Sequence, residues 1–186
     1  MSSGFFNTVD TRTIEAAGSG DRRAQEVLYR QFSAPVYGLA RRMLAEVPAA
    51  EDATHEIFLD LFGKLGQYRG DAPFGAWLRR VAVNHCLMRI RSGWNSRRDA
   101  LAAEPEGVHE TAGETGKDLE TLLDRLSPTD RAVLWLKEVE GFSHAEIATM
   151  FNRSVSFSKS RLARAHEQLR SVSREEVNRC MPQPIN

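Results

Sequence analysis

Apolar residues recur at helical spacing in two separate stretches of the chain, residues 11–98 and residues 119–174. In the first stretch, Asp21 is placed to cap a long helix, Pro35 is expected to kink that helix, and Pro48 is expected to break the chain after it. The pattern predicts helices over 11–17, 21–44, 51–65 and 74–91.

The apolar faces of the last three of these helices define the expected core of the first stretch. The helix over 21–44 supplies Val27, Leu28, Phe32, Val36, Leu39, Ala40 and Met43. The helix over 51–65 supplies Ala53, Ile57, Phe58, Leu61, Phe62 and Leu65. The helix over 74–91 supplies Trp77, Leu78, Val81, Ala82, Leu87 and Ile90.

Helix-capping residues punctuate the second stretch. Ser127 is an N-cap for a helix expected over 128–139, which has proline at its first position. Ser143 and Glu146 form a capping box that opens a short helix ending near residue 151.

A three-residue turn, 152–154, separates this short helix from a last helix expected over 155–173. Asn152 tolerates the left-handed backbone conformation that such a turn needs. The expected inner faces of the two helices consist of Ile147, Ala148, Val155, Leu162, Ala165 and Leu169. Because no segment has the pattern of a strand, the sequence predicts an all-α protein of two small helical domains.

The segment between the two stretches, residues 99–118, has a different composition. It contains one proline, three glycines and six acids against one lysine, with few large apolar residues. Such a segment buries too little apolar surface to offset the entropy cost of ordering it, so we expect a flexible acidic linker.

The overall composition is that of a soluble protein, with 41% hydrophobic and 27% charged residues. No apolar run is long enough to span a membrane, and the N-terminus lacks the pattern of a signal peptide. Cys86 and Cys180 lie far apart, without disulfide or zinc-ligand spacing. These features favour a reduced, cytoplasmic location without membrane insertion.

The formal net charge of zero at first argues against nucleic-acid binding, but the charge is unevenly distributed. Residues 10–98 carry 14 basic against 10 acidic side chains, and residues 119–174 carry nine against seven. Two positive segments are therefore joined by a negative one, which is compatible with contact to DNA.

The short capped helix, the turn and the longer basic helix form a helix-turn-helix, whose second helix enters the major groove of DNA. Lys and Arg neutralise phosphates and bond guanine edges, and an exposed Phe can pack on a thymine methyl. A solvated basic surface is the alternative, and the caps and the turn favour DNA contact. The outward residues of the second helix are Ser156, Phe157, Lys159, Ser160, Arg161 and Arg164.

An acidic stripe lies on the helix expected over 51–65. Asp52, Glu56 and Asp60 recur every four residues and so share one face, beside His55. This spacing suits a metal, an acid–base pair or a basic partner surface, and a solvated helix face is the simplest alternative.

Arginines and aromatic residues interleave around the next helix. Arginines track a phosphate backbone, and aromatic rings stack on unpaired bases. Membrane binding is disfavoured because the helix lacks a continuous exposed apolar face, and Trp77 has the spacing of a core residue. The residues are Arg79, Arg80, Arg89, Arg91, Arg97 and Arg98, with Tyr68, Phe74, Trp77 and Trp94.

Several motifs, in this order, resemble the extracytoplasmic-function (ECF) sigma factors, RNA polymerase initiation factors of the sigma-70 family. The segment EDATHEIFL (51–59) is similar to region 2.2, and YRGDAPFGAWLRRVAVN (68–84) is similar to regions 2.3 and 2.4. EGFSHAEIA (140–148) and KSRLARA (159–165) are similar to region 4, as is LSP (126–128). A linker in place of a third domain is typical of the ECF group.

The resemblance implies a role for each part. The domain over 11–98 would bind core RNA polymerase, with Asp52, His55 and Glu56 docking on the coiled coil of its largest subunit. The same domain would engage the minus-ten element and a flipped base of the melted single strand. The residues implied for that contact are Tyr68, Phe74, Arg79, Arg80, Asn84, Arg91, Trp94, Arg97 and Arg98.

The domain over 119–174 would bind the polymerase flap and read the minus-thirty-five element through the outward residues of its last helix. The linker over 99–118 would run near the RNA exit path, and an anti-sigma factor wedged between the domains is the expected regulator. The resemblance implies no catalytic residue, cofactor or metal, because the polymerase supplies the chemistry.

This chain departs from its relatives at several motif positions. His55 stands where relatives usually carry glutamine, and Ala49 stands where an acid often begins the motif, so polymerase affinity is expected to be tuned or pH-sensitive. Residues 156–158, Ser-Phe-Ser, replace a usual Gly-Thr-Val. We hypothesise that Phe157 contacts a thymine methyl and shifts the minus-thirty-five preference, so Phe157→Ala should change binding to a selected promoter.

Two other functions are compatible with parts of the sequence. A helix-turn-helix regulator with an unrelated helical sensor domain would bind duplex DNA without polymerase, but it leaves the arginine cluster unexplained. A metal-dependent hydrolase would use His109 and Glu110, or the Asp52 and Glu56 carboxylates, but a second histidine at ligand spacing is missing.

Overall fold

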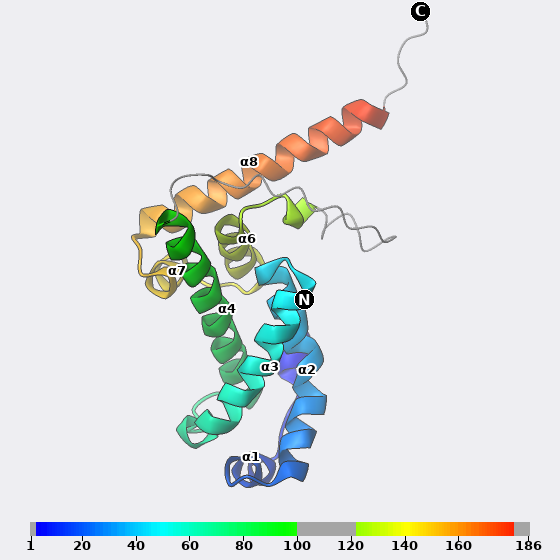
Figure 1. Ribbon diagram of the computed structural model, residues 1–186, viewed down its shortest axis with the longest axis vertical. Coiled ribbons are helices and arrows are strands. Elements are labelled where there is room, and N and C mark those ends of the chain that lie inside the picture. The colour runs from blue at the N-terminus through cyan, green and yellow to red at the C-terminus, as the bar shows by residue number, and fades with distance from the viewer. Residues whose placement is uncertain (1–2, 100–121, 181–186) are drawn as a thin grey trace, which may run out of the picture. The chain divides into compact units, whose positions relative to one another are not determined.

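The computed structural model describes residues 3–99 and 122–180 and divides the chain into two compact units, residues 1–100 and 101–186 (Figure 1). Every regular element in the described ranges is a helix, which confirms the all-α prediction. The expected linker lies outside the described residues except for its first residue, and the domain limits stay predictions.

Three long helices form the body of the first unit. Helices α2, α3 and α4 pack against one another, and α1 packs against α2 and η2 (Figure 1). Asp21 caps α2 as predicted, because its carboxylate accepts from the backbone N–H of Arg23 at 2.8 Å. The elements are η1 (Ser3–Phe6), α1 (Thr11–Gly18), α2 (Arg22–Leu44), α3 (Val47–Lys64), η2 (Leu65–Gln67) and α4 (Phe74–Asp99).

Two of the three prolines in this unit lie inside helices, and the third, Pro73, directly precedes α4. Helix α2 continues through Pro35. The prediction that Pro48 breaks the chain is wrong, because α3 begins at Val47 and Pro48 lies in its first turn. A first-turn proline costs no hydrogen bond, since the N–H groups there have no partner within the helix. Ala45, with a φ of 70°, makes the turn from α2.

The core of the first unit follows the predicted apolar faces closely. One prediction is wrong: Val27 is 49% exposed, because it lies off the row of buried positions that begins at Ala24 and continues with Leu28. Phe62, Trp77 and Val81 are half-buried rather than fully buried. The fully enclosed positions include Leu28, Phe32, Val36, Met43, Ile57, Leu61, Leu78, Val83 and Leu87.

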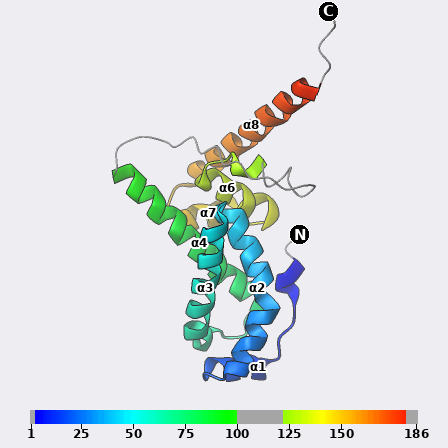
Figure 2. The same ribbon diagram turned by 45° about the vertical axis from the view of Figure 1, so that its right-hand side comes forward.

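Residues 3–9, here called the N-terminal strap, run along α2 (Figure 2). Phe5 is buried, and the side-chain amide of Gln31 donates to the Thr8 carbonyl at 3.1 Å. The strap also packs on α4, where a Cβ at Gly75 would overlap the Phe5 carbonyl oxygen. Glycine at position 75 therefore allows the close approach of two backbones.

In the described residues 122–180 of the second unit, a helix-turn-helix follows α6 (Pro128–Leu134). Helix α6 packs on α8, and α7 packs on α8 as well. The helix expected over 128–139 changes to π-helical winding at Trp135, where the backbone N–H of Glu140 donates to the Trp135 carbonyl at 3.1 Å. The elements are α6 (Pro128–Leu134), η3 (Trp135–Val139, π-helical), α7 (His144–Phe151) and α8 (Val155–Cys180).

The capping box and the turn of the helix-turn-helix are confirmed. The Ser143 hydroxyl accepts from the N–H of Glu146 at 3.2 Å, and the Glu146 carboxylate accepts from the N–H of Ser143 at 2.8 Å. Asn152 has a φ of 52°, in the left-handed region. Val155, expected on the inner face, is 42% exposed because it begins α8.

Candidate functional site

The exposed face of α3 carries the predicted acidic stripe. Asp52, His55 and Glu56 are exposed, so the residues implied for polymerase binding lie on an accessible surface. His55 is held to its own helix, since its Nδ1 lies 3.0 Å from the Glu51 carbonyl oxygen. Asp60, the last carboxylate of the stripe, forms an ion pair with Lys64 at 2.9 Å.

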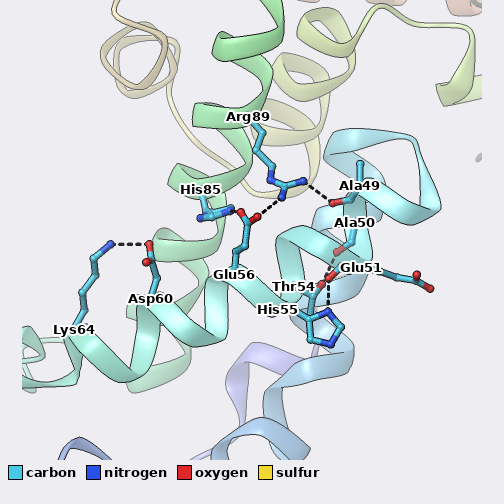
Figure 3. A network of polar contacts seen from close by, with 10 residues as sticks. All are labelled: Ala49, Ala50, Glu51, Thr54, His55, Glu56, Asp60, Lys64, His85 and Arg89. Carbon is cyan, nitrogen blue, oxygen red and sulfur yellow. Dashed lines mark hydrogen bonds and ion pairs between the residues drawn. The ribbon is translucent and has the colours of Figure 1, made fainter.

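Glu56 links this face to α4 (Figure 3). One carboxylate oxygen accepts from Nη2 of Arg89 at 2.7 Å, and the other lies 3.0 Å from Nε2 of His85. Arg89 also donates to the Ala49 carbonyl at 3.3 Å and thereby reaches the first turn of α3. The residues Glu56, His85 and Arg89, here called the α3–α4 network, join the acidic stripe to the arginine-rich helix.

The electrostatics of Glu56 follow from this network. The hydrogen bond from Arg89 lowers the pKa of the Glu56 carboxyl, and the charge of Arg89 and the contact with His85 act in the same direction. Partial burial opposes them. Half of the Glu56 side chain remains exposed, so a partner can reach an ionised carboxylate whose orientation is already fixed.

Three aromatic rings gather where the loop after α3 meets α4. The Tyr68 ring centroid lies 5.4 Å from those of Phe74 and Trp77, and the Tyr68 hydroxyl donates to the Ala72 carbonyl at 2.7 Å. Phe74 is only 4% exposed and packs on Phe32 from the core side. The Phe74 ring, implied as a contact for a base, is therefore buried. Of Phe74 and Tyr68, Tyr68 is the more accessible ring.

The outer face of α4 presents a row of exposed side chains next to this cluster. Arg80 and Asn84 are exposed and one turn apart, and Met88, 59% exposed, continues the row. Arg79 and Arg91 are half-buried and interact with other groups of the protein. Three further residues implied for minus-ten contact belong to the last turns of α4, and their side chains lie outside the described part of the chain: Trp94, Arg97 and Arg98.

The recognition helix α8 presents only part of its predicted set to solvent. Ser156, Lys159, Ser160 and Arg164 are exposed. Phe157 is half-buried, because its ring packs on Phe151 of α7 with a centroid distance of 5.6 Å. The Arg161 guanidinium also lies over the Phe157 ring, 5.5 Å from the centroid, and is half-buried.

Ser158 occupies an inward position of the recognition helix. The residue is fully buried, and its hydroxyl lies 2.9 Å from Nδ1 of His144 at the start of α7. This hydrogen bond satisfies a polar group in a place that the packing of α7 on α8 otherwise fills with apolar side chains. Ser158 therefore fixes the contact between the two helices of the helix-turn-helix.

Sequence reasoning missed the pairings between helices that hold the predicted residues in place. His85 and Arg89 are 29 and 33 positions from Glu56. Asp130, in α6, forms ion pairs with Arg161 and Arg164. No local spacing signals such pairs, since they depend on how helices pack.

Two further findings concern the described part of the chain alone. No group of three histidine, cysteine or acidic side chains gathers there in a way that could hold a metal ion. No helix there combines the length and the apolar character required to cross a membrane. His109 and Glu110, proposed for a metal-dependent hydrolase, lie outside the described residues.

Fold and site together define a two-domain helical protein with a carboxylate face and an arginine-rich helix in one unit and a helix-turn-helix in the other. Family models for Sigma-70 region 2 and Sigma-70, region 4 match residues 28–96 and 116–169. The chain belongs to the ECF group of RNA polymerase sigma factors, in the sigma-70 family.

Curated relatives agree with this assignment over most of their length. The RNA polymerase sigma-H factor of Pseudomonas aeruginosa is 31% identical over 176 residues, which cover 86% of this chain and 91% of the relative. The ECF RNA polymerase sigma factor SigM of Mycobacterium tuberculosis is 32% identical over 166 residues, covering 86% and 82%.

Two solved structures share the fold. One is the sigma factor RpoE in complex with the anti-sigma factor NepR from Bartonella quintana, with a TM-score of 0.53 and 20% identity, covering 80% of this chain and 96% of that one. The other is CnrH in complex with the cytosolic domain of CnrY, with a TM-score of 0.50 and 22% identity, covering 88% and 96%.

Proposed function

We propose that this protein binds core RNA polymerase and directs it to promoters whose minus-ten element is read by α4 and whose minus-thirty-five element is read by α8. The observation that carries the proposal is the placement of an exposed carboxylate face beside an arginine-rich helix in one unit, in a chain that also holds a capped helix-turn-helix. A transcription factor that only binds duplex DNA has no use for the first unit's surface.

The polymerase contact is assigned to the exposed face of α3. Asp52, His55 and Glu56 suit a basic surface such as the coiled coil of the largest subunit. Glu56 is held in one orientation by His85 and Arg89, which lowers the entropy that docking must remove. The second unit is assigned to the polymerase flap.

The minus-ten contact is assigned to α4 and the loop before it. Arg80 and Asn84 are positioned for the phosphate backbone and base edges, with Arg79 and Arg91 beside them. Tyr68 offers an aromatic ring for a flipped base, and the buried Phe74 packs against that ring in an edge contact. Trp94, Arg97 and Arg98 extend the same helix.

The minus-thirty-five contact is assigned to α8. Ser156, Lys159, Ser160 and Arg164 supply donors at its exposed face, and Arg161 and Phe157 lie at the edge of that face. Because Phe157 packs on Phe151, its contact with a thymine methyl would involve only the exposed edge of the ring.

Control by an anti-sigma factor in the cytoplasm completes the proposal. Structural neighbours were solved with an anti-sigma factor or with a cytosolic domain bound, which supports this mode of regulation. Such an inhibitor is expected to block transcription when it is added before core polymerase and to act weakly once the holoenzyme has formed.

In vitro transcription on a promoter library tests the proposal. Bacterial core polymerase with this protein should initiate at a small set of related promoters, and core polymerase alone should not. Competent core polymerase that gains no promoter specificity from the protein would contradict the proposal. Specific binding of the free protein to duplex DNA, without any effect on initiation, would instead indicate an ordinary helix-turn-helix regulator.

A further inference from the structure

Asp130 is a fully buried carboxylate in the first turn of α6, and it faces the recognition helix. Its Oδ1 lies 3.4 Å from Nη1 of Arg161, and its Oδ2 lies 3.8 Å from Nε of Arg164. The Ser127 hydroxyl donates to Oδ2 at 2.7 Å. Each oxygen of one buried carboxylate is therefore directed at a different arginine of α8.

This burial is informative because a buried carboxylate is costly unless charges and hydrogen bonds compensate it. An acid in the first turn of a helix interacts favourably with the helix dipole while exposed to solvent, so capping α6 does not require Asp130 to be buried. Its compensation comes from Ser127 on its own side and from two arginines across the domain. Asp130 is therefore part of the contact between α6 and α8.

The contact continues from Arg161 across the helix-turn-helix. The Arg161 guanidinium carbon lies 5.5 Å from the Phe157 ring centroid, and that ring lies 5.6 Å from Phe151 of α7. A row of side chains thereby runs from α6 through α8 to α7. Groups fixed in this way before DNA arrives lose less conformational entropy on binding.

We propose that Asp130 is a positioning residue that sets the minus-thirty-five specificity of the recognition helix. Its carboxylate orients Arg161 and Arg164 and cancels one of their two charges. DNA binding by α8 then depends more on contacts to the bases and less on attraction to phosphates of any sequence. The inference rests on the proposed function, in which α8 reads the minus-thirty-five element.

The substitution Asp130→Asn removes the negative charge. It keeps the size of the side chain and its ability to accept a hydrogen bond from Ser127. Without the negative charge of Asp130, the arginine pair should gain about one phosphate contact, which steepens the dependence of log affinity on log salt by about 0.9. Affinity for a scrambled duplex should rise. The preference for the selected over the scrambled duplex should fall roughly fivefold, a loss comparable to a mild base-pair mismatch.

The experiment measures holoenzyme binding to two labelled duplexes by fluorescence anisotropy over a range of salt concentrations. One duplex carries the selected minus-thirty-five element and the other a scrambled version of equal base composition. The matched control is Asp124→Asn, which removes a negative charge of the same unit that is ion-paired with the buried Arg131 of α6. This control should keep the wild-type preference and the wild-type salt slope.

The outcomes separate the two proposals. Wild-type holoenzyme without any preference between the duplexes would contradict the proposed function itself. A wild-type preference that Asp130→Asn leaves unchanged, together with an unchanged salt slope, would overturn the role of Asp130. An equal loss of preference in Asp124→Asn would overturn it as well.

Thermal melting checks that each variant is folded at the temperature of the binding assay. If Asp130→Asn is unfolded there, Ser127→Ala replaces it, because that change keeps the negative charge but removes the hydroxyl that orients it. Ser127→Ala should lower the preference and leave the salt slope at its wild-type value. An unchanged preference in this variant would overturn the inference.

Discussion

At the scale of single residues, Gly75 shows how one missing side chain can determine a contact between distant parts of the chain. It is the second residue of α4, and the carbonyl of Phe5 occupies the space that a Cβ would fill. Phe5 itself is buried, with 4% of its surface exposed. The N-terminal strap and the start of α4 therefore form one packed unit.

Gly75→Ala should destabilise the first unit by about 1–3 kcal/mol, the usual cost of overpacking, because the strap must move away from α4. Urea unfolding followed by circular dichroism measures the change. Gly63→Ala is the matched control, since a Cβ at that position of α3 meets no neighbouring atom, and it should raise stability by up to about 1 kcal/mol. Equal unfolding midpoints for Gly75→Ala and wild type would show that the strap does not pack in this way.

Glu56 gives the molecule a pH-dependent contribution to stability. The contact with Arg89 lowers the pKa of the Glu56 carboxyl in the folded state. A depressed folded-state pKa stabilises the protein fully above the ordinary glutamate pKa of about 4.3, and the contribution disappears as the pH falls through the folded-state value.

Glu56→Gln should therefore cost stability at neutral pH and cost progressively less below about pH 4. The loss at neutral pH should stay below about 1 kcal/mol, since solvent screens an ion pair that is half-exposed. The measurement is the difference in unfolding free energy between variant and wild type as a function of pH. Asp52→Asn, on the same face of α3, is the control, and an identical pH profile for both variants would count against the α3–α4 network.

At the scale of elements, the capping box of α7 positions the first helix of the helix-turn-helix. Ser143→Ala removes the hydroxyl that accepts from the Glu146 N–H and should cost about 1 kcal/mol of stability in the second unit. Binding to a minus-thirty-five duplex should weaken along with it.

Thr149→Ala is the control for this change. The Thr149 hydroxyl donates only within its own helix, to the Ala145 carbonyl at 3.0 Å, so its loss should be nearly neutral. Urea midpoints and duplex affinities of the two variants can be compared directly. A larger loss for Thr149→Ala than for Ser143→Ala would show that the cap does not control this helix.

Elements whose signals are local were predictable from the sequence. Asp21, Ser127 and the pair Ser143 and Glu146 act on backbone groups two or three positions away, so their spacing alone reveals them. Pro48 was misassigned because proline suits both the end of one helix and the first turn of the next. Only the geometry of Ala45 distinguishes the two cases.

The exposed residues of the candidate sites were predictable from the sequence. The contacts that hold those residues in place were not. The spacing of Asp52, His55 and Glu56 identified a shared accessible face. The contacts of Glu56 with α4, and of Asp130 with α8, depend on helix packing, which a single sequence does not encode in any local spacing. The burial of Phe74 and the packing of Phe157 on Phe151 escaped prediction for the same reason.

At the scale of the whole molecule, the two units are expected to fold independently. Each encloses its own apolar core, from Phe5 to Ile90 in one and from Leu123 to Ala165 in the other. Fragments covering residues 1–100 and 101–186 should each be helical and unfold cooperatively in urea.

Substitutions should then act only on the unit that contains them. Gly75→Ala should shift the unfolding of the first fragment, and Ser143→Ala should shift that of the second. A fragment without a cooperative transition would show that one unit needs the other in order to fold.

The N-terminal strap also constrains how such a sequence can evolve. Because the Phe5 carbonyl lies where a Cβ of residue 75 would be, the two positions are not independent. A descendant that keeps the strap has to keep glycine at position 75. A descendant that loses the strap can carry alanine or serine there, and both have a higher helix propensity than glycine. Aligned descendants should therefore show glycine at this position together with a buried aromatic residue near the N-terminus, and both should disappear together.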